Sequence, residues 1–236
     1  MSTCTLIEGS EPLIKGTLRK GNVFLLSAPP GSGKTSFCLD FLYQGLKDAQ
    51  PAIALVTDCS PSDMLSMASS LGLNLEQYVE AGSLRIIDCY SWRLGEKITA
   101  PYFVEPKSLS DVSIGIEKSR FGLRNGRFTF DSVSSLILGS STSTAISFLS
   151  TLSARLKRDG FDCIFVLEGG ADDEKTVAML RYITDGVLEM KTDESTGKIE
   201  RFFRIYSLRG VYHQTCWVHF MISDRGFVLE IGSDRL

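Results

Sequence analysis

The chain has 236 residues, of which 43% are hydrophobic and 22% are charged, which is the composition of an ordinary globular protein. Its 25 lysines and arginines against 28 aspartates and glutamates give a net charge of −3, so no overall positive field draws it to nucleic acid or anionic lipid. No signal-peptide pattern opens the chain and no apolar run is long enough to span a bilayer. We therefore expect a cytoplasmic protein with no membrane partner.

The six cysteines are scattered along the chain, without Cys-x-x-Cys spacing or a nearby cluster of histidines. Three of them, Cys38, Cys163 and Cys216, lie inside apolar runs, where a free thiol packs as a small hydrophobic group. Neither a disulfide framework nor a zinc site is expected from this pattern.

Strand and helix signals alternate over the first three quarters of the chain. Apolar runs predict five strands, at residues 22–27, 52–57, 84–88, 127–131 and 163–167. Helical spacing and capping residues predict helices between and after them, at residues 35–48, from Ser60 onward, 109–124, 142–159 and 172–183. This alternation predicts an α/β protein with a mainly parallel central sheet flanked by helices.

The pattern changes near residue 184. Short strands joined by Gly- and Asp-containing turns are predicted at residues 186–191, 199–208, 216–222 and 227–230, which is typical of an antiparallel β meander. We expect one domain over 1–236, with a core at about 20–184 and the meander at about 185–231. The segment from Cys89 to about Ser108 is too long for a plain connection, so we expect it to be functional.

A Gly-rich turn stands between the first strand and the first helix and ends in Gly33-Lys34-Thr35. A strand, such a turn and a helix form the context of a phosphate-binding P-loop, in which main-chain amides and the helix N-terminus surround a triphosphate. Lys34 would contact the β- and γ-phosphates, and the Thr35 hydroxyl would bind Mg²⁺. Ala28 stands where the usual pattern has its first glycine. The predicted nucleotide-binding residues are Pro30, Gly31, Ser32, Gly33, Lys34, Thr35 and Ser36.

Four of the predicted strands end in an acidic residue: Asp58, Asp88, Asp131 and Glu168. Because the carboxyl ends of parallel strands form the ligand edge of a sheet, we expect these acids near the P-loop. Asp131 has the place of the acid that holds Mg²⁺ in P-loop NTPases, although a helix or turn cap would fit the same position. The next residue is Ser132, so any general base must come from elsewhere.

Several motifs in the same order resemble the KaiC-like branch of the RecA superfamily, close to the archaeal RadA paralogues of the RadC type. They are Gly21–Lys47, Asp58–Pro61, Ile86–Asp88, Phe130–Ser134, Asp185–Val187 and Leu208–His213. The resemblance implies an archaeal RecA-like P-loop NTPase core, ATP and Mg²⁺ as ligands, and a homo-oligomeric ring or filament with ATP between subunits.

The resemblance also implies catalytic roles for Asp58, Glu168, Arg209 and His213. Two adjacent glutamates are usual in the family where this chain has Asp58 and Cys59, and a lysine is usual two residues before Arg209. Arg209 and His213 would reach the γ-phosphate of the adjacent subunit, with Arg209 as an arginine finger, and Glu168 would sense the γ-phosphate. Without the resemblance, the sequence around Glu168 is equally consistent with a solvated acid, and the sequence around Arg209 and His213 is consistent with a solvated turn.

Three functions are open at this point. The favoured one is an ATP-binding protein with slow Mg²⁺-dependent hydrolysis, acting as an oligomeric switch or a recombination and repair accessory factor that contacts DNA or another RecA-family protein. The second is a non-hydrolysing subunit that ATP stabilises for binding a partner. The third is a small-molecule kinase, which we rank below the others because the meander stands where such an enzyme needs an Arg-rich lid.

Overall fold

A single nine-stranded sheet forms the centre of the computed structural model, which describes residues 6–95, 100–170 and 174–231. The strand order across the sheet is β11-β10-β8-β7-β2-β6-β5-β3-β4. The strands are β2 (Val23–Ala28), β3 (Ala52–Val56), β4 (Leu84–Asp88), β5 (Arg127–Asp131), β6 (Asp162–Glu168), β7 (Gly186–Asp193), β8 (Glu200–Leu208), β10 (Val218–Ser223) and β11 (Gly226–Glu230). The six strands from β7 to β4 run parallel, and β8, β10 and β11 continue the same sheet in antiparallel pairing.

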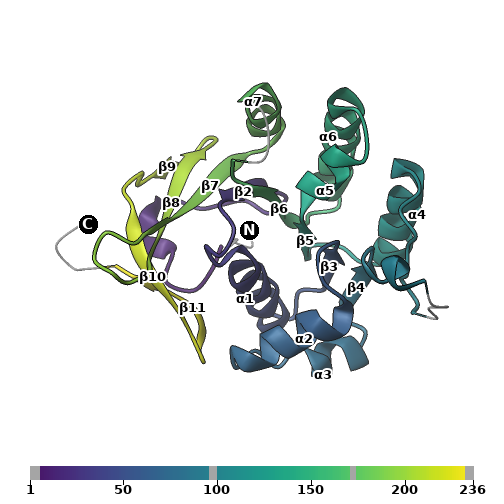
Figure 1. Ribbon diagram of the computed structural model, residues 1–236, viewed down its shortest axis with the longest axis horizontal. Coiled ribbons are helices and arrows are strands. Elements are labelled where there is room, and N and C mark those ends of the chain that lie inside the picture. The colour runs from purple at the N-terminus through teal and green to yellow at the C-terminus, as the bar shows by residue number, and fades with distance from the viewer. Residues whose placement is uncertain (1–5, 96–99, 171–173, 232–236) are drawn as a thin grey trace.

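Helices cover both faces of this sheet (Figure 1). On one face lie α1 (Lys34–Lys47), α2 (Pro61–Ser70) and α3 (Glu76–Glu80), and on the other lie α4 (Leu109–Arg120), α5 (Val133–Leu138), α6 (Thr142–Arg158) and α7 (Glu174–Ile183). Two short 3₁₀ helices, η1 (Glu11–Leu13) and η2 (Ser91–Leu94), lie outside these layers. Among the described helices, none combines the length and the apolar character needed to cross a bilayer.

The α/β fold class expected from the sequence is confirmed, with a mainly parallel sheet and antiparallel strands at its C-terminal end. One detail differs from the expectation of a purely antiparallel meander. Its first strand, β7, pairs in parallel with β2 on one side and in antiparallel fashion with β8 on the other. The meander is therefore an extension of the core sheet.

Local capping signals located the start of α2 correctly. The Ser60 hydroxyl accepts a hydrogen bond from the Asp63 amide at 3.1 Å, and the Asp63 carboxylate accepts one from the Ser60 amide at 3.3 Å. This reciprocal pair satisfies two donors at the helix start. The helix predicted at 109–124 instead ends at Arg120, and the first residues of the one predicted at 172–183 fall outside the described ranges.

Short elements were missed by the sequence reasoning. The helices α3 and α5 have five and six residues, which is too short for a helical period to stand out. The two-residue strands β1 (Ile14–Lys15) and β9 (Tyr212–His213) pair with each other across almost 200 residues of chain, which is a tertiary contact without a local signal.

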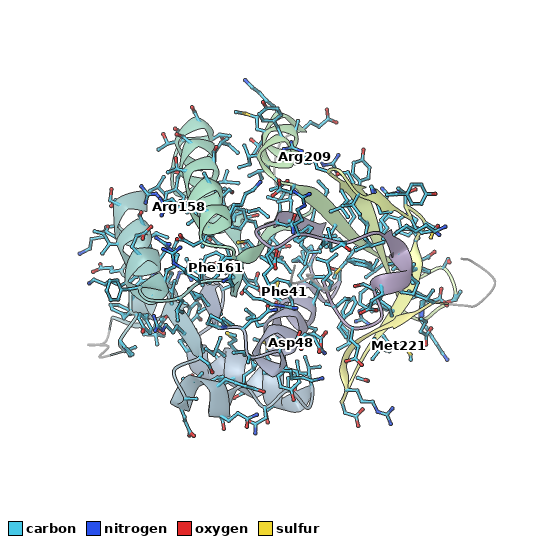
Figure 2. All side chains as sticks on the ribbon, turned by 180° about the vertical axis from the view of Figure 1, so that it is seen from behind. Phe41, Asp48, Arg158, Phe161, Arg209 and Met221 are labelled. Carbon is cyan, nitrogen blue, oxygen red and sulfur yellow. The ribbon has the colours of Figure 1, made fainter. Side chains whose placement is uncertain are left out.

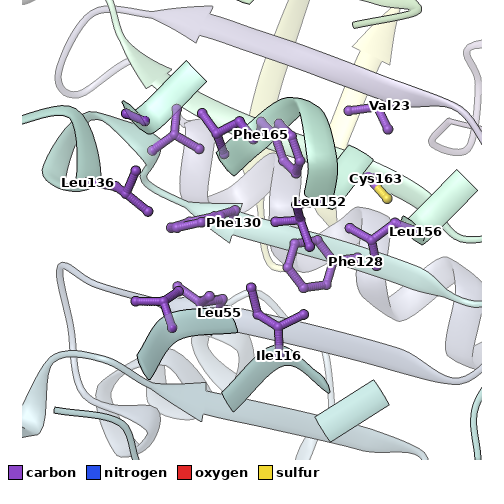
Figure 3. Close-up of a cluster of buried hydrophobic side chains, with 14 of the residues drawn as sticks. Val23, Leu55, Ile116, Phe128, Phe130, Leu136, Leu152, Leu156, Cys163 and Phe165 are labelled. Atoms are coloured by element: carbon purple, nitrogen blue, oxygen red, sulfur yellow. The ribbon is translucent and has the colours of Figure 1, made fainter. Parts of the chain in front are cut away.

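Aromatic side chains hold the helices and the meander to the sheet. Under α4, α5 and α6, the rings of Phe128 and Phe130 pack edge to face against Phe165, at 6.4 and 6.3 Å between centroids (Figure 3). On the other face, Phe37 of α1 stacks on Phe203 at 5.5 Å and meets the edge of Phe227 at 5.1 Å. This second cluster fixes the meander against the helix that follows the Gly-rich turn.

Asp40 of α1 is a buried carboxylate where this helix meets the turn before β11. Its side chain is only 2% exposed, and its Oδ2 has no hydrogen-bond partner within the described part of the chain. A Cβ atom on Gly226 would lie 2.8 Å from its Oδ1, so the two segments are closely packed here. Burial, and secondarily the charge of Glu8, raises the pKa of Asp40 to about 6.

We expect Asp40→Asn to stabilise the protein more at pH 8 than at pH 5. Since the folded-state pKa lies above the unfolded value of 3.8, the stability that the protonated carboxyl provides is lost as the pH rises toward and past 6. The variant's gain in unfolding free energy should grow by about 1 kcal/mol between the two pH values. Urea unfolding measures it, with Asp48→Asn at the exposed end of α1 as control. An equal gain at both pH values would contradict the raised pKa of Asp40 in the folded protein.

Candidate nucleotide-binding site

The Gly-rich turn leaves the end of β2 and enters α1 with two glycines in the left-handed region. Gly31 has φ 73° and Gly33 has φ 99°, conformations that glycine adopts without strain. The Ser32 hydroxyl donates to the Pro29 carbonyl at 2.7 Å and closes the turn. The first amides of α1 therefore face the carboxyl edge of the sheet, where a helix N-terminus attracts anions.

Lys34 lies inside this turn and is almost buried, with 7% of its side chain exposed. Its ammonium group donates to the carbonyls of Pro29 and Ala28 at 2.8 and 3.2 Å and to the Glu168 carboxylate at 2.9 Å. A phosphate group at this lysine would compete with the Glu168 carboxylate for the same N–H donors.

Thr35 and Asp131 meet next to the lysine. The Thr35 hydroxyl donates to the Asp131 carboxylate at 3.2 Å. Burial, and then the negative charge of Asp58, raises the pKa of Asp131 to about 6, although the Thr35 hydroxyl and the charge of Lys34 act in the opposite direction. A hydroxyl and a carboxylate are oxygen ligands that suit Mg²⁺. No group of three or more His, Cys, Asp or Glu side chains gathers around a metal position in the described ranges, so phosphate oxygens and water would have to complete the coordination.

Asp58 and Cys59 follow β3 and line the same cavity as Lys34, Thr35 and Asp131. Burial, together with the nearby charge of Asp131, raises the pKa of the Cys59 thiol to about 12. The thiol is therefore neutral near pH 7 and supplies no base. Asp58 is therefore the acidic side chain of this two-residue segment that lines the cavity.

The cavity has a volume of about 530 Å³, within the range of small-molecule sites. Its polar end is the Gly-rich turn with the acids described above. Its other end is apolar and was not foreseen from the sequence, because it arises where α1 and α2 stand apart over small residues of β3. The side chains of this end include Leu39, Leu42, Ala54, Val56, Met64 and Met67.

Asp88 was expected beside the P-loop, and this expectation was wrong. Its strand, β4, is the outermost of the sheet, four strands from β2, or roughly 19 Å at the usual spacing between strands. The Asp88 carboxylate accepts the amides of Tyr90 and Ser91 at 3.0 and 2.9 Å, so it caps the turn that leads into η2.

Arg209 and His213 lie near the amino ends of the parallel strands, whereas the Gly-rich turn lies at their carboxyl ends. Leu208 pairs with Gly186, which pairs with Phe24 near the start of β2, whereas the Gly-rich turn follows the end of β2. Four to five residues of strand, about 15 Å, separate the two levels. Arg209 is exposed beside α7 (Figure 2), where its guanidinium donates to the Tyr182 carbonyl. His213 is half-buried and pairs through its backbone with Ile14.

A mainly parallel sheet with a Gly-rich turn, a buried lysine and a Thr–Asp pair at its carboxyl edge defines the P-loop nucleotide-binding class. The chain also matches the family described as "ATPase: KaiC" over residues 3–233. It belongs to this KaiC-like ATPase family, which makes it an ATP-binding protein of the RecA fold.

The chain is similar to proteins that span its whole length. A UPF0273 protein of Pyrococcus horikoshii is 29% identical over 95% of this chain and 92% of its own length. The circadian clock oscillator protein KaiC of Thermostichus vulcanus is 27% identical over 98% of this chain, which spans 45% of that protein. The crystal structure of a KaiC-like protein from Pyrococcus horikoshii, at 21% identity, superposes with a TM-score of 0.76 over 98% of this chain and 99% of its own, which supports the fold.

Because Glu168 competes for the lysine, we expect Glu168→Gln to bind ATP·Mg²⁺ more tightly than the wild type. The substitution removes a carboxylate 2.9 Å from the Lys34 ammonium group, and the gain should be on the order of 3- to 10-fold in Kd. Calorimetry measures the affinity. Glu105→Gln is the matched control, because Glu105 pairs with Lys107 at the same distance outside this cavity. Unchanged binding would show that Glu168 does not compete with the nucleotide, and weaker binding would show that it assists the nucleotide instead.

Proposed function

We propose that this protein is a slow Mg²⁺-dependent ATPase that acts as an oligomeric nucleotide switch. The observation that carries the proposal is a contrast within one cavity. The lysine, the Thr35–Asp131 pair and the Gly-rich turn are all present, while the acidic pair usual in the family is reduced to Asp58 and a neutral Cys59. Such a site favours nucleotide binding over turnover.

Each side chain has a defined task in this proposal. The turn amides and Lys34 bind the phosphates, and Thr35 and Asp131 hold Mg²⁺, which when bound neutralises charge on the phosphate oxygens. Asp58 orients a water molecule and accepts its proton, a role for which its side chain is one methylene shorter than the usual glutamate. Glu168 leaves Lys34 when the phosphates arrive, which makes it the sensor of an occupied site.

Arg209 and His213 support an oligomer in which each subunit completes its neighbour's site. Both residues lie too far from the Gly-rich turn of their own subunit to contact a nucleotide bound there, so in this proposal they act on the site of the adjacent subunit. Arg209 is the arginine finger that stabilises charge on the transferred phosphate. A heterologous contact of this kind closes a ring or extends into a filament.

Further assignments stay predictions of the same proposal. They are one ATPase domain over 1–236, a cytoplasmic location, an archaeal source, kinship with the RadA paralogues, and a role as recombination accessory factor for DNA or another RecA-family protein. The unbroken sheet from β4 to β11 supports the single domain. The neutral Cys59 thiol keeps a non-hydrolysing, ATP-stabilised subunit as the second candidate.

The base assignment predicts opposite effects of two substitutions on ATP hydrolysis. Asp58→Asn should lower turnover at least about 10-fold with little change in ATP affinity, because a general base acts in the transition state. Cys59→Glu should raise turnover by restoring a carboxylate. Phosphate release under saturating ATP·Mg²⁺ is the measurement, and Asp224→Asn in the exposed turn before β11 is the control. Wild-type turnover unaffected by Asp58→Asn would contradict the role of Asp58, and no phosphate release by any variant would favour the second candidate.

The trans arrangement predicts that two inactive variants restore each other. Lys34→Ala removes the phosphate contact and Arg209→Ala removes the finger, so each alone should be inactive. A 1:1 mixture should recover about one quarter of wild-type turnover, since one mixed interface in four pairs an intact turn with an intact arginine. The control replaces the first partner with the double variant Lys34→Ala/Arg209→Ala, which should restore nothing. An inactive mixture of subunits that demonstrably exchange would mean that Arg209 does not act in trans.

A further inference from the structure

A second cavity lies at the same edge of the sheet, on the face covered by α4 and α5. Its volume is about 360 Å³, and it is separate from the nucleotide cavity on the α1 and α2 face. It forms between the strand ends of β3 and β5, the η2 segment and the first turn of α4. Its size is that of a site for a small organic molecule.

The floor of the second cavity is apolar. Leu55, Phe130 and Leu136, which Figure 3 labels in a cluster of buried hydrophobic side chains, contribute to it together with Val112 of α4. Trp92 forms one wall and is 39% exposed. Its indole N–H donates to the Cys89 carbonyl at 3.0 Å, which fixes the orientation of the ring. Such a pocket offers a flat, partly solvated aromatic surface to a ligand.

The rim carries positive charge. Arg93 lies over the rings of Tyr90 and Trp92, at 5.2 and 5.6 Å, and donates to the Thr57 carbonyl at 2.6 Å. Within residues 6–95, 100–170 and 174–231, no carboxylate forms an ion pair with it, so most of its planar donors are free for a ligand. Lys107 also lines the rim and pairs with Glu105.

We infer that this second cavity binds a small organic anion with an apolar, preferably planar body. The anionic group, a carboxylate, sulfonate or phosphate ester, pairs with the fork of Arg93, which suits such groups geometrically. The body fills the space over Phe130 and Leu136 beside Trp92. The charge of the rim and the apolar floor together select an amphipathic anion over a neutral or cationic molecule.

Thr57 connects the second cavity to the nucleotide cavity. Its side chain lines the second cavity, while its hydroxyl accepts the Ser132 amide at 2.8 Å. The one proton of this hydroxyl has two acceptors at 3.0 Å, the Asp131 carbonyl and the Asp58 carboxylate. Its own carbonyl is the acceptor that holds Arg93. A ligand that draws Arg93 toward its anionic group therefore acts, through Thr57, on the backbone of the predicted Mg²⁺-binding acid. The anion is an effector of nucleotide binding in this arrangement.

The binding test uses anilinonaphthalene sulfonate, a fluorescent aromatic anion, and phenylnaphthylamine, its uncharged analogue, on the nucleotide-free protein. Ser135→Trp fills the cavity from α5, with Ser150→Trp on the exposed face of α6 as control. Arg93→Gln removes the rim charge, with the exposed Arg124→Gln as control. Circular dichroism checks that each variant is folded. If Ser135→Trp does not fold, the comparison of Arg93→Gln with its control still tests the proposal.

We expect Ser135→Trp to weaken binding of both probes at least about 10-fold and Arg93→Gln to weaken only the anionic probe, by about 5- to 10-fold. Both controls should behave as the wild type. Binding that survives Ser135→Trp would overturn the site, and an equal loss of both probes in Arg93→Gln would overturn the anion class. A smaller oligomer in Ser135→Trp with unchanged probe binding would assign the cavity to contacts between copies of the chain and overturn the proposal.

The effector role rests on the proposed nucleotide site and is tested apart from binding. ATP·Mg²⁺ should change the Kd of the anionic probe, and the probe should change the Kd of ATP·Mg²⁺ by the same factor. Thr57→Val, which keeps the shape and removes the hydroxyl, should reduce this factor toward one. Probe binding without any mutual effect would overturn the effector role alone. A protein that fails to bind ATP refutes the proposed function and leaves the probe comparisons readable.

Discussion

The parallel pairing of β2 with β6 is the constraint on which the rest of this structure depends. Ala28 and Glu168 stand opposite each other in register, so the Gly-rich turn and the acid that ends β6 leave the sheet at the same level. The Gly169 amide donates to the Ala28 carbonyl at 2.7 Å and keeps the two exits together. The position of Lys34 between Pro29 and Glu168 follows from this register. A shift by one residue would point alternate side chains to the other face and separate the two charges.

The groups proposed to bind the nucleotide and the group proposed to act as base lie at different places along the carboxyl edge of the sheet. Lys34 and Thr35 follow β2 directly through the Gly-rich turn. Asp131 ends β5, which is two places from β2 in the sheet, and its carboxylate accepts the Thr35 hydroxyl. The proposed base, Asp58, by contrast lies in the loop that follows β3, a strand three places from β2 in the sheet. A shortened side chain at Asp58 and a neutral thiol at Cys59 change only that loop. In the proposed function, substitutions after β3 therefore change turnover and leave the groups that bind the nucleotide in place.

Both cavities of the carboxyl edge are built on β3 and β5, from opposite faces. Alternation along β3 directs Ala54 and Val56 to the α1 and α2 side and Leu55 and Thr57 to the α4 and α5 side. The strand end that the two sites share is hydrogen-bonded across the sheet, since the Thr57 amide donates to the Asp131 carbonyl at 2.9 Å. This continuity, with Thr57 at its centre, is the physical basis of the proposed effect of a ligand in the second cavity on nucleotide binding.

The sequence by itself determined the order of the longer strands and helices along the chain, the Gly-rich turn with Lys34 and Thr35, and the capping box at Ser60, because each depends on neighbours within a few residues. The short elements α3, α5, β1 and β9 gave no such local signal. Tertiary structure alone decided the order of strands across the sheet. That order brought Asp58 and Glu168 to the cavity and left Asp88 at the outer edge, although all three end predicted strands in the same way. The antiparallel direction of β8 put Arg209 and His213 at the opposite end of the strands from the Gly-rich turn. Packing between segments far apart in the chain also formed the apolar end of the nucleotide cavity and the whole of the second cavity. Cavities and distances between strand ends depend on contacts between segments far apart in the chain, and no local pattern of residues encodes them.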